Sequence, residues 1–149
     1  MSERRPALVL RVPSRTEYLA AIRDVTRRMA EIAGFDGASS DQLALAVDEA
    51  STNVIEHAYA GAGDRRIEIR FVERGAELRV EVVDDGSAVD PRAVPRVDLR
   101  RYASERRTGG LGVHLMGRIM DRVTFRRAGR TNVCCMVKRK PAPGSRAAP

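Results

Sequence analysis

The chain lacks tryptophan, and aromatic residues make up only 4% of its 149 residues. A domain of this length can bury a substantial core, and here that core must be aliphatic. The only cysteines are Cys134 and Cys135, and there are two histidines. Adjacent strand residues point to opposite faces of a sheet, so these cysteines do not pair readily, and the histidines lie too far away for a zinc site. We expect two buried free thiols in a reducing compartment.

Long apolar runs are also missing. No segment approaches the roughly 20 apolar residues that a membrane-spanning helix needs. The first hydrophobic stretch, ALVLRV, is short and contains an arginine, whereas a signal peptide has a longer apolar region and a small-residue cleavage site. We therefore expect a cytoplasmic protein that does not bind membranes.

Three common signatures are absent as well. The chain has no Gly-Lys pair, which excludes a P-loop. Its glycine-rich stretch TGGLGV follows charged residues where a dinucleotide-binding fingerprint requires a strand. The residues expected of eukaryotic-type protein kinases are missing too. Any nucleotide site must therefore be of another type.

Positive charge is plentiful but dispersed. The formal net charge is +7, and almost all of the positive charge comes from arginine, since the only lysines are Lys138 and Lys140. A basic balance can indicate a nucleic-acid partner. Here the arginines are interleaved with acids, and no basic run contains aromatic residues. Direct nucleic-acid binding is therefore a remote alternative, and acidic proteins or nucleotides suit this surface equally well.

The hydrophobic pattern predicts an α+β domain. Alternating apolar residues indicate strands, and apolar residues at helical spacing indicate helices. The expected strands are residues 7–13, 65–74 and 76–85 and a closing hairpin over 122–140, and the expected helices are residues 14–34, 40–60 and 111–122. Helices on one face of a mostly antiparallel mixed sheet would form a two-layer α/β sandwich.

The remaining segments set the domain limits. Residues 1–140 are expected to form a single domain, followed by a disordered tail over 141–149. Residues 86–109 sustain no period, and a loop of that length is usually functional or disordered. Ser14 and Thr16 are candidate caps for the first helix, and Ser40 and Asp41 for the second.

The second helix combines an apolar face with a polar edge. At 100° per residue, one stripe contains Leu43, Val47, Ala50, Val54 and Ala58. Roughly 80° away by the same geometry, a second stripe contains Glu49, Asn53 and His57. An acid at the border of a buried face can act as a base, and an amide oxygen can bind Mg²⁺. The alternative is an ordinary solvated edge.

Two glycine-containing segments follow that helix. A strand ends at Asp84, Asp85 and Gly86. An aspartate beside a glycine suits a planar ligand with an amino group, although Asp-Gly is also a common turn. The stretch TGGLG (residues 108–112) leads into a helix, whose first N–H groups can bind an anion. Its alternative role is a flexible hinge.

In this order the motifs resemble those of the GHKL (Bergerat-fold) ATPases, and specifically of the anti-sigma-factor serine/threonine kinases. The likeness covers about residues 7–139. DEASTNVIEHAY resembles the N-box, DDGSA the first glycine box and GGLGVHLM the second. The first box usually ends in a glycine, and here Ala88 stands at that position.

The resemblance implies a role for each matching residue. Glu49 would be the catalytic base for a protein serine, Asn53 the Mg²⁺ ligand, and Asp84 the contact to the adenine amino group. Residues 86–109 would form the ATP lid, in which both Arg106 and Arg107 are candidates to reach the γ-phosphate. The full set of cofactor-binding residues would be Asn53, Asp84, Gly86, Ala88, Arg107, Gly109, Gly110, Leu111, Gly112, Val113 and Thr131.

The resemblance also bears on Thr131 and on His57. Thr131 would support the adenine site through the aspartate and a water molecule. His57 is interpreted as structural, because the histidine that accepts phosphate in the related sensor kinases lies in a separate helical domain.

The resemblance also implies a function and partners. The chain would be an ATP- and Mg²⁺-dependent protein serine kinase that binds a sigma factor. It would phosphorylate a serine of an anti-sigma-factor antagonist and so regulate sigma-factor release. A homodimer formed near the first strand is expected. The alternative is a nucleotide-binding switch of the same fold without kinase activity.

Overall fold

The computed structural model describes residues 7–88 and 110–142. These form five strands, three α-helices, a 3₁₀ turn and a π-helical turn. The strands are β1 (Leu8–Pro13), β2 (Arg66–Arg74), β3 (Glu77–Asp84), β4 (Arg122–Ala128) and β5 (Thr131–Arg139). The helical elements are η1 (Thr16–Tyr18), α1 (Leu19–Ile32), α2 (Gly37–Asn53), the π-helical η2 (Val54–Ala58) and α4 (Gly110–Ile119).

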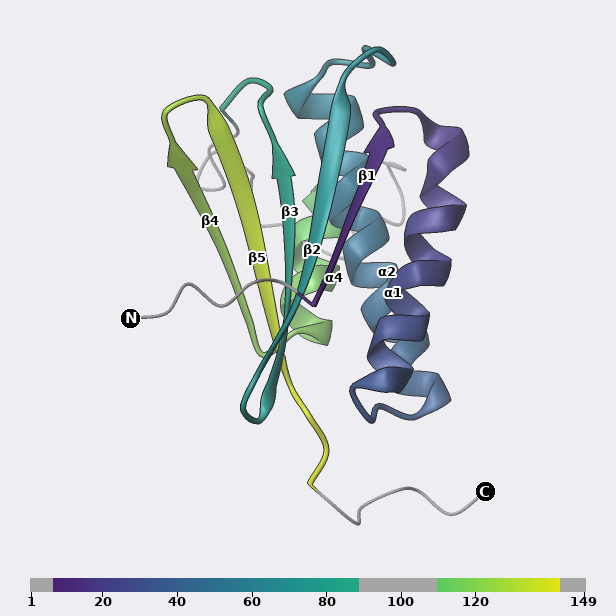
Figure 1. Cartoon of the computed structure of the whole chain (residues 1–149). Coiled ribbons are helices and arrows are strands. Elements are labelled where there is room, and N and C mark those ends of the chain that lie inside the picture. The colour runs from purple at the N-terminus through teal and green to yellow at the C-terminus, as the bar shows by residue number, and fades with distance from the viewer. Residues whose placement is uncertain (1–6, 89–109, 143–149) are drawn as a thin grey trace.

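The strands form one sheet in the order β1-β2-β3-β5-β4. The helices lie together on one face of it, with α2 in contact with both α1 and α4 (Figure 1). This confirms the predicted two-layer α+β architecture. Every pairing within the described sheet is antiparallel, so this part of the sheet is not mixed.

The core lies between the sheet and the helices. The alternation read from the sequence is confirmed, because the predicted inner residues of β2 and β3 are all fully buried: Ile67, Ile69, Phe71, Leu78, Val80 and Val82. The predicted apolar stripe of α2 and η2 packs against them. The core is mainly aliphatic, as expected, and Phe71, Met116 and Met136 complete it.

None of the four candidate residues caps a helix, because Arg15 and Tyr18 precede η1 and α1, without a side-chain cap bond, and Asp36 precedes α2. Ser14 is buried, and its hydroxyl donates to Ala62 O at 2.6 Å and accepts from Arg65 N at 3.1 Å. It therefore ties the end of β1 to the start of β2. The second helix begins earlier than expected, because Asp36 caps it by accepting a hydrogen bond from Ser39 N at 2.7 Å. Ser40 lies inside that helix.

The cysteines are free thiols, as predicted, but only Cys134 is buried, while Cys135 on the opposite face is half-buried. Burial raises the pKa of the Cys134 thiol to about 12. None of the helices in the described ranges combines the length and apolar character needed to cross a bilayer.

Candidate functional site

The site begins with Glu49 on α2. Its carboxyl group is only partly exposed, and burial raises its pKa above the ordinary value of 4.5. The negative charges of Asp48 and Glu56 raise the pKa further. Asn53, also partly buried, is the last residue of α2, one turn beyond Glu49. The predicted pair therefore lies at the edge of the helix layer, and its acid holds a proton more readily than a solvated carboxyl does.

The helix changes its winding directly after Asn53. In η2 the N–H of Tyr59 donates to Val54 O at 2.9 Å, an i to i+5 bond. The wider turn buries Val54 and Ile55 together. It also interrupts the regular spacing of the polar stripe, and His57 is exposed. The structural role interpreted for His57 is therefore not supported by burial.

Gly86 joins the end of η2 to the end of β3. A Cβ atom at Gly86 would lie 2.4 Å from the carbonyl oxygen of Ala58, and this approach leaves no room for any side chain. The same oxygen accepts a hydrogen bond from Ser87 N at 2.9 Å. Glycine is thus required because two backbones touch, and the contact fixes the first glycine segment against the helix that carries Glu49 and Asn53.

Asp84 is the buried acid of the site, with a relative exposure of 7%. Its Oδ1 accepts hydrogen bonds from Gly86 N at 2.9 Å and from the Asn132 side chain at 2.8 Å. Asp84 and Asn132 are directly paired across β3 and β5. The sequence analysis missed Asn132, and only the register of these two strands could have revealed it.

Thr131 is the first residue of β5, directly before Asn132. Successive residues of a strand face opposite sides of the sheet, and Asn132 is the residue that shares the face of Asp84. Asn132 makes the direct contact to Asp84, and the water-mediated support of the adenine site by Thr131 stays a prediction.

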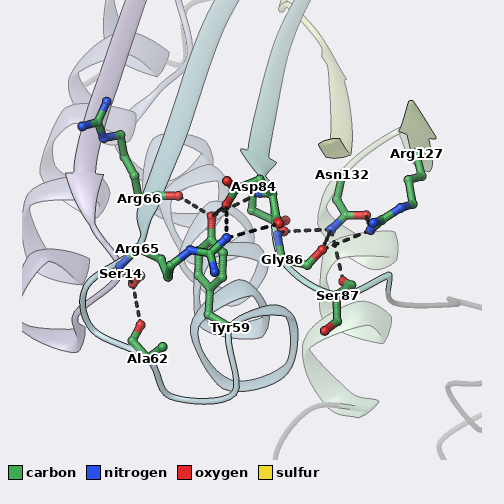
Figure 2. A network of polar contacts seen from close by, with 11 residues as sticks. Ser14, Tyr59, Ala62, Arg65, Arg66, Asp84, Gly86, Ser87, Arg127 and Asn132 are labelled. Atoms are coloured by element: carbon green, nitrogen blue, oxygen red, sulfur yellow. Dashed lines mark hydrogen bonds and ion pairs between the residues drawn. The ribbon is translucent and has the colours of Figure 1, made fainter. Parts of the chain in front are cut away.

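A second polar cluster lies beside Asp84 (Figure 2). The Tyr59 hydroxyl lies 2.6 Å from Arg66 O and 2.9 Å from the Asp85 carboxylate, to which Arg65 also donates at 2.9 Å. The hydrogen bonds from Arg65 and Tyr59 lower the pKa of Asp85. Burial raises the pKa of Tyr59 to about 12. These contacts anchor the end of η2 to the ends of β2 and β3.

The second glycine segment is described in part. Arg106, Arg107 and Gly109 lie outside the described residues, as does most of the predicted lid. The first turn of α4 consists of Gly110, Leu111, Gly112 and Val113. This helix packs against α2, which places its N-terminal turn on the same side of the sheet as the predicted base. Ala88 is exposed at the end of the first described range.

Residues 12–138 match the model of the histidine kinase-like ATPase domain, which defines the class of this protein. Serine-protein kinase RsbW of Listeria monocytogenes is 32% identical over 120 residues, covering 78% of this chain and 76% of that protein. RsbW of Bacillus subtilis is 33% identical over 119 residues, covering 76% and 74%. The chain therefore belongs to the RsbW family of serine-protein kinases, as the sequence motifs predicted.

Two solved structures share the fold. The SiaB–SiaC complex from Pseudomonas aeruginosa matches with a TM-score of 0.64 at 13% identity, covering 89% of each chain. The RsbU and RsbW domains of Rv1364c from Mycobacterium tuberculosis match with a TM-score of 0.60 at 16% identity. That match covers 90% of this chain and 32% of the larger one. Both support the predicted architecture.

Proposed function

We propose that this chain is an ATP- and Mg²⁺-dependent kinase that phosphorylates a serine of an anti-sigma-factor antagonist and thereby regulates the release of a sigma factor. The observation that carries the proposal is the junction of two motifs. Gly86, next but one to Asp84, packs against the carbonyl of Ala58, at the end of the helical segment that carries Glu49 and Asn53. Family membership favours this function over nucleic-acid binding.

Glu49 is the proposed general base. The serine oxygen attacks the γ-phosphorus, its proton moves to the Glu49 carboxylate, and ADP leaves with the electrons of the broken bond. A base works best when its pKa lies close to the working pH. The direction in which burial shifts the pKa of Glu49 supports this role.

Asn53 is the proposed Mg²⁺ ligand, since a side-chain amide oxygen suits a hard cation. Bound Mg²⁺ supplies neutralisation of the phosphate charge. Asp84 is the proposed partner of the adenine amino group. The roles of Arg107, of Gly109 and of Gly110, Leu111, Gly112 and Val113 at the phosphates remain predictions from the motif.

The test separates binding from transfer. Glu49→Ala is expected to retain ATP binding by calorimetry and to lose phosphate transfer from labelled ATP. Asn53→Ala is expected to lose the Mg²⁺-dependent part of the affinity. Asp24→Ala, which removes an exposed acid from α1, serves as the control and should retain both. Unchanged transfer by Glu49→Ala would refute the base assignment.

The proposed partners are a sigma factor, an anti-sigma-factor antagonist and a second copy of this chain. The net charge of +7 suits an acidic partner, and the Pseudomonas fold relative was solved as a complex. We place the homodimer contact at β1, an edge strand whose Leu8 is 38% exposed, and the protein in the cytoplasm. A pull-down followed by a kinase assay on the captured proteins tests both partners, and light scattering tests the dimer.

A further inference from the structure

The side chain of Asn132 makes several hydrogen bonds that the proposed function does not use. Its Nδ2 lies 2.8 Å from Asp84 Oδ1, 3.2 Å from Gly86 O and 3.1 Å from Ser87 O. The two N–H groups of the amide are thus shared among three acceptors. Figure 2 shows that these acceptors line the segment that leaves β3. One side chain of β5 therefore holds both the buried acid and the first residues of the segment after it.

Arg127 fixes the orientation of this amide. The guanidinium nitrogen Nη1 donates to Asn132 Oδ1 at 2.8 Å and to Gly86 O at 3.1 Å. An arginine has donors only, and an ionised aspartate has acceptors only. A flipped amide would place its N–H groups against the Arg127 donor and its oxygen against the acceptor oxygens of Asp84, Gly86 and Ser87. The amide therefore always presents its N–H groups to Asp84.

The orientation of the Asn132 amide determines which carboxylate oxygen of Asp84 can accept a hydrogen bond from a ligand. Both hydrogen bonds that the described residues make to Asp84 end on Oδ1. Within the described part of the chain, Oδ2 is left as an acceptor for a donor on a ligand. A purine with an exocyclic amino group supplies such a donor, whereas a purine with hydrogen at that position does not.

We infer that Asn132, oriented by Arg127, is a positioning residue that sets the base selectivity of the site. It saturates one oxygen of Asp84 and holds the other in place for an amino group. The inference rests on the proposed nucleotide-binding function, but the two can fail separately, as the following experiment shows.

Calorimetry compares ADP with purine riboside diphosphate, which has hydrogen in place of the amino group. The wild type is expected to prefer ADP. Asn132→Ala should weaken ADP binding about 10-fold or more, since hydrogen bonds to charged groups are worth that much. It should change the binding of the analogue little, so the ratio of the two affinities falls. A variant that is merely less folded loses both ligands equally and keeps the ratio.

A second variant adds a pH signature. In Asn132→Asp two carboxyl groups face each other, and such a pair retains one shared proton above the pH at which an isolated carboxyl loses it. With that proton the pair mimics the amide, and without it the two charges repel. ADP affinity relative to the wild type should therefore fall as the pH rises from about 5 to about 8.

Variants of β4 complete the design. Arg127→Ala frees the amide to flip and should lower the selectivity for ADP. Arg126→Ala removes the neighbouring exposed arginine, which faces the other side of the strand, and should behave as the wild type.

The outcomes separate the two proposals. If the wild type fails to bind millimolar ADP, both the function and the inference are wrong. If the wild type binds ADP and Asn132→Ala retains the full selectivity, the inference alone is wrong. A pH-independent Asn132→Asp variant would also overturn it.

Discussion

Glu49 carries a carboxylate that folding makes harder to ionise. Burial is the main cause, and the charges of Asp48 and Glu56 act in the same direction. The unfolded chain loses this proton near the ordinary pKa of 4.5, and the folded chain loses it at higher pH. Between these two values the folded state binds more protons. The free energy of unfolding therefore decreases as the pH rises through this window.

A neutral side chain at position 49 should remove that cost. Glu49→Gln is expected to abolish transfer and to raise the melting temperature at pH 7. The gain should vanish below about pH 4, where the carboxyl is protonated in both states. Thermal unfolding across the pH range measures it. Asp24→Asn changes the net charge equally at an exposed position and is the control. A melting temperature for Glu49→Gln below that of the wild type at pH 7 would contradict this account.

At the scale of elements, the contact between η2 and the residues that follow β3 leaves no room for a side chain at Gly86. A methyl group at Gly86 would overlap the Ala58 carbonyl, so either the strand end or the π-helical turn must move. Gly86→Ala is expected to cost about 3 kcal/mol in the free energy of unfolding and to weaken ADP binding. Chemical denaturation measures the first effect and calorimetry the second.

Gly117→Ala is the matched control. Gly117 is exposed inside α4, and nothing lies within 4 Å of a Cβ atom built on it. Alanine at this helical position should stabilise the protein by about 0.5–1 kcal/mol. Two substitutions of the same kind are thus expected to have opposite signs. A stable Gly86→Ala variant with normal ADP binding would mean that the junction is not rigid.

These elements also show what the sequence could predict. The predictions of β2 and β3 were correct because apolar and polar residues alternate with a period of two in IEIRF and LRVEV. The α2 core stripe was correct for the same kind of reason. The π-helical turn was missed because an i to i+5 bond has no composition of its own. Ser14 was assigned to a helix cap because its true partners, Ala62 and Arg65, are distant in sequence.

In the candidate site too, the residues in local motifs could be predicted from the sequence, and a residue that depends on strand pairing could not. Glu49, Asn53, Asp84 and Gly86 could be proposed from the sequence because each lies in a local motif with a chemical meaning. Asn132 was missed because its importance depends on strand register, which places it opposite a residue 48 positions away. Without knowledge of how β3 pairs with β5, the sequence gives no reason to choose Asn132 over Thr131 as the partner of Asp84.

At the scale of the whole molecule, nucleotide binding and folding are linked. A ligand that binds only the folded state at 100 times its dissociation constant adds about 2.7 kcal/mol to stability. For a chain of this length that corresponds to an increase of roughly 5–10 °C in the melting temperature. ATP with Mg²⁺ is expected to produce such an increase, and inorganic phosphate at equal concentration is the control. A melting temperature unmoved by millimolar ATP would refute the proposed function.

The cluster around Tyr59 contains an aromatic ring close to Asp84. The chain has three tyrosines and no tryptophan, so its ultraviolet emission comes from tyrosine alone. The Arg65 guanidinium carbon lies 5.0 Å from the centroid of the Tyr59 ring, and the Tyr59 hydroxyl donates a hydrogen bond to Asp85, the neighbour of Asp84. A nucleotide base bound at Asp84, as proposed, is expected to change the surroundings of this phenol. Tyrosine emission is therefore expected to report occupancy of the proposed nucleotide site without any label.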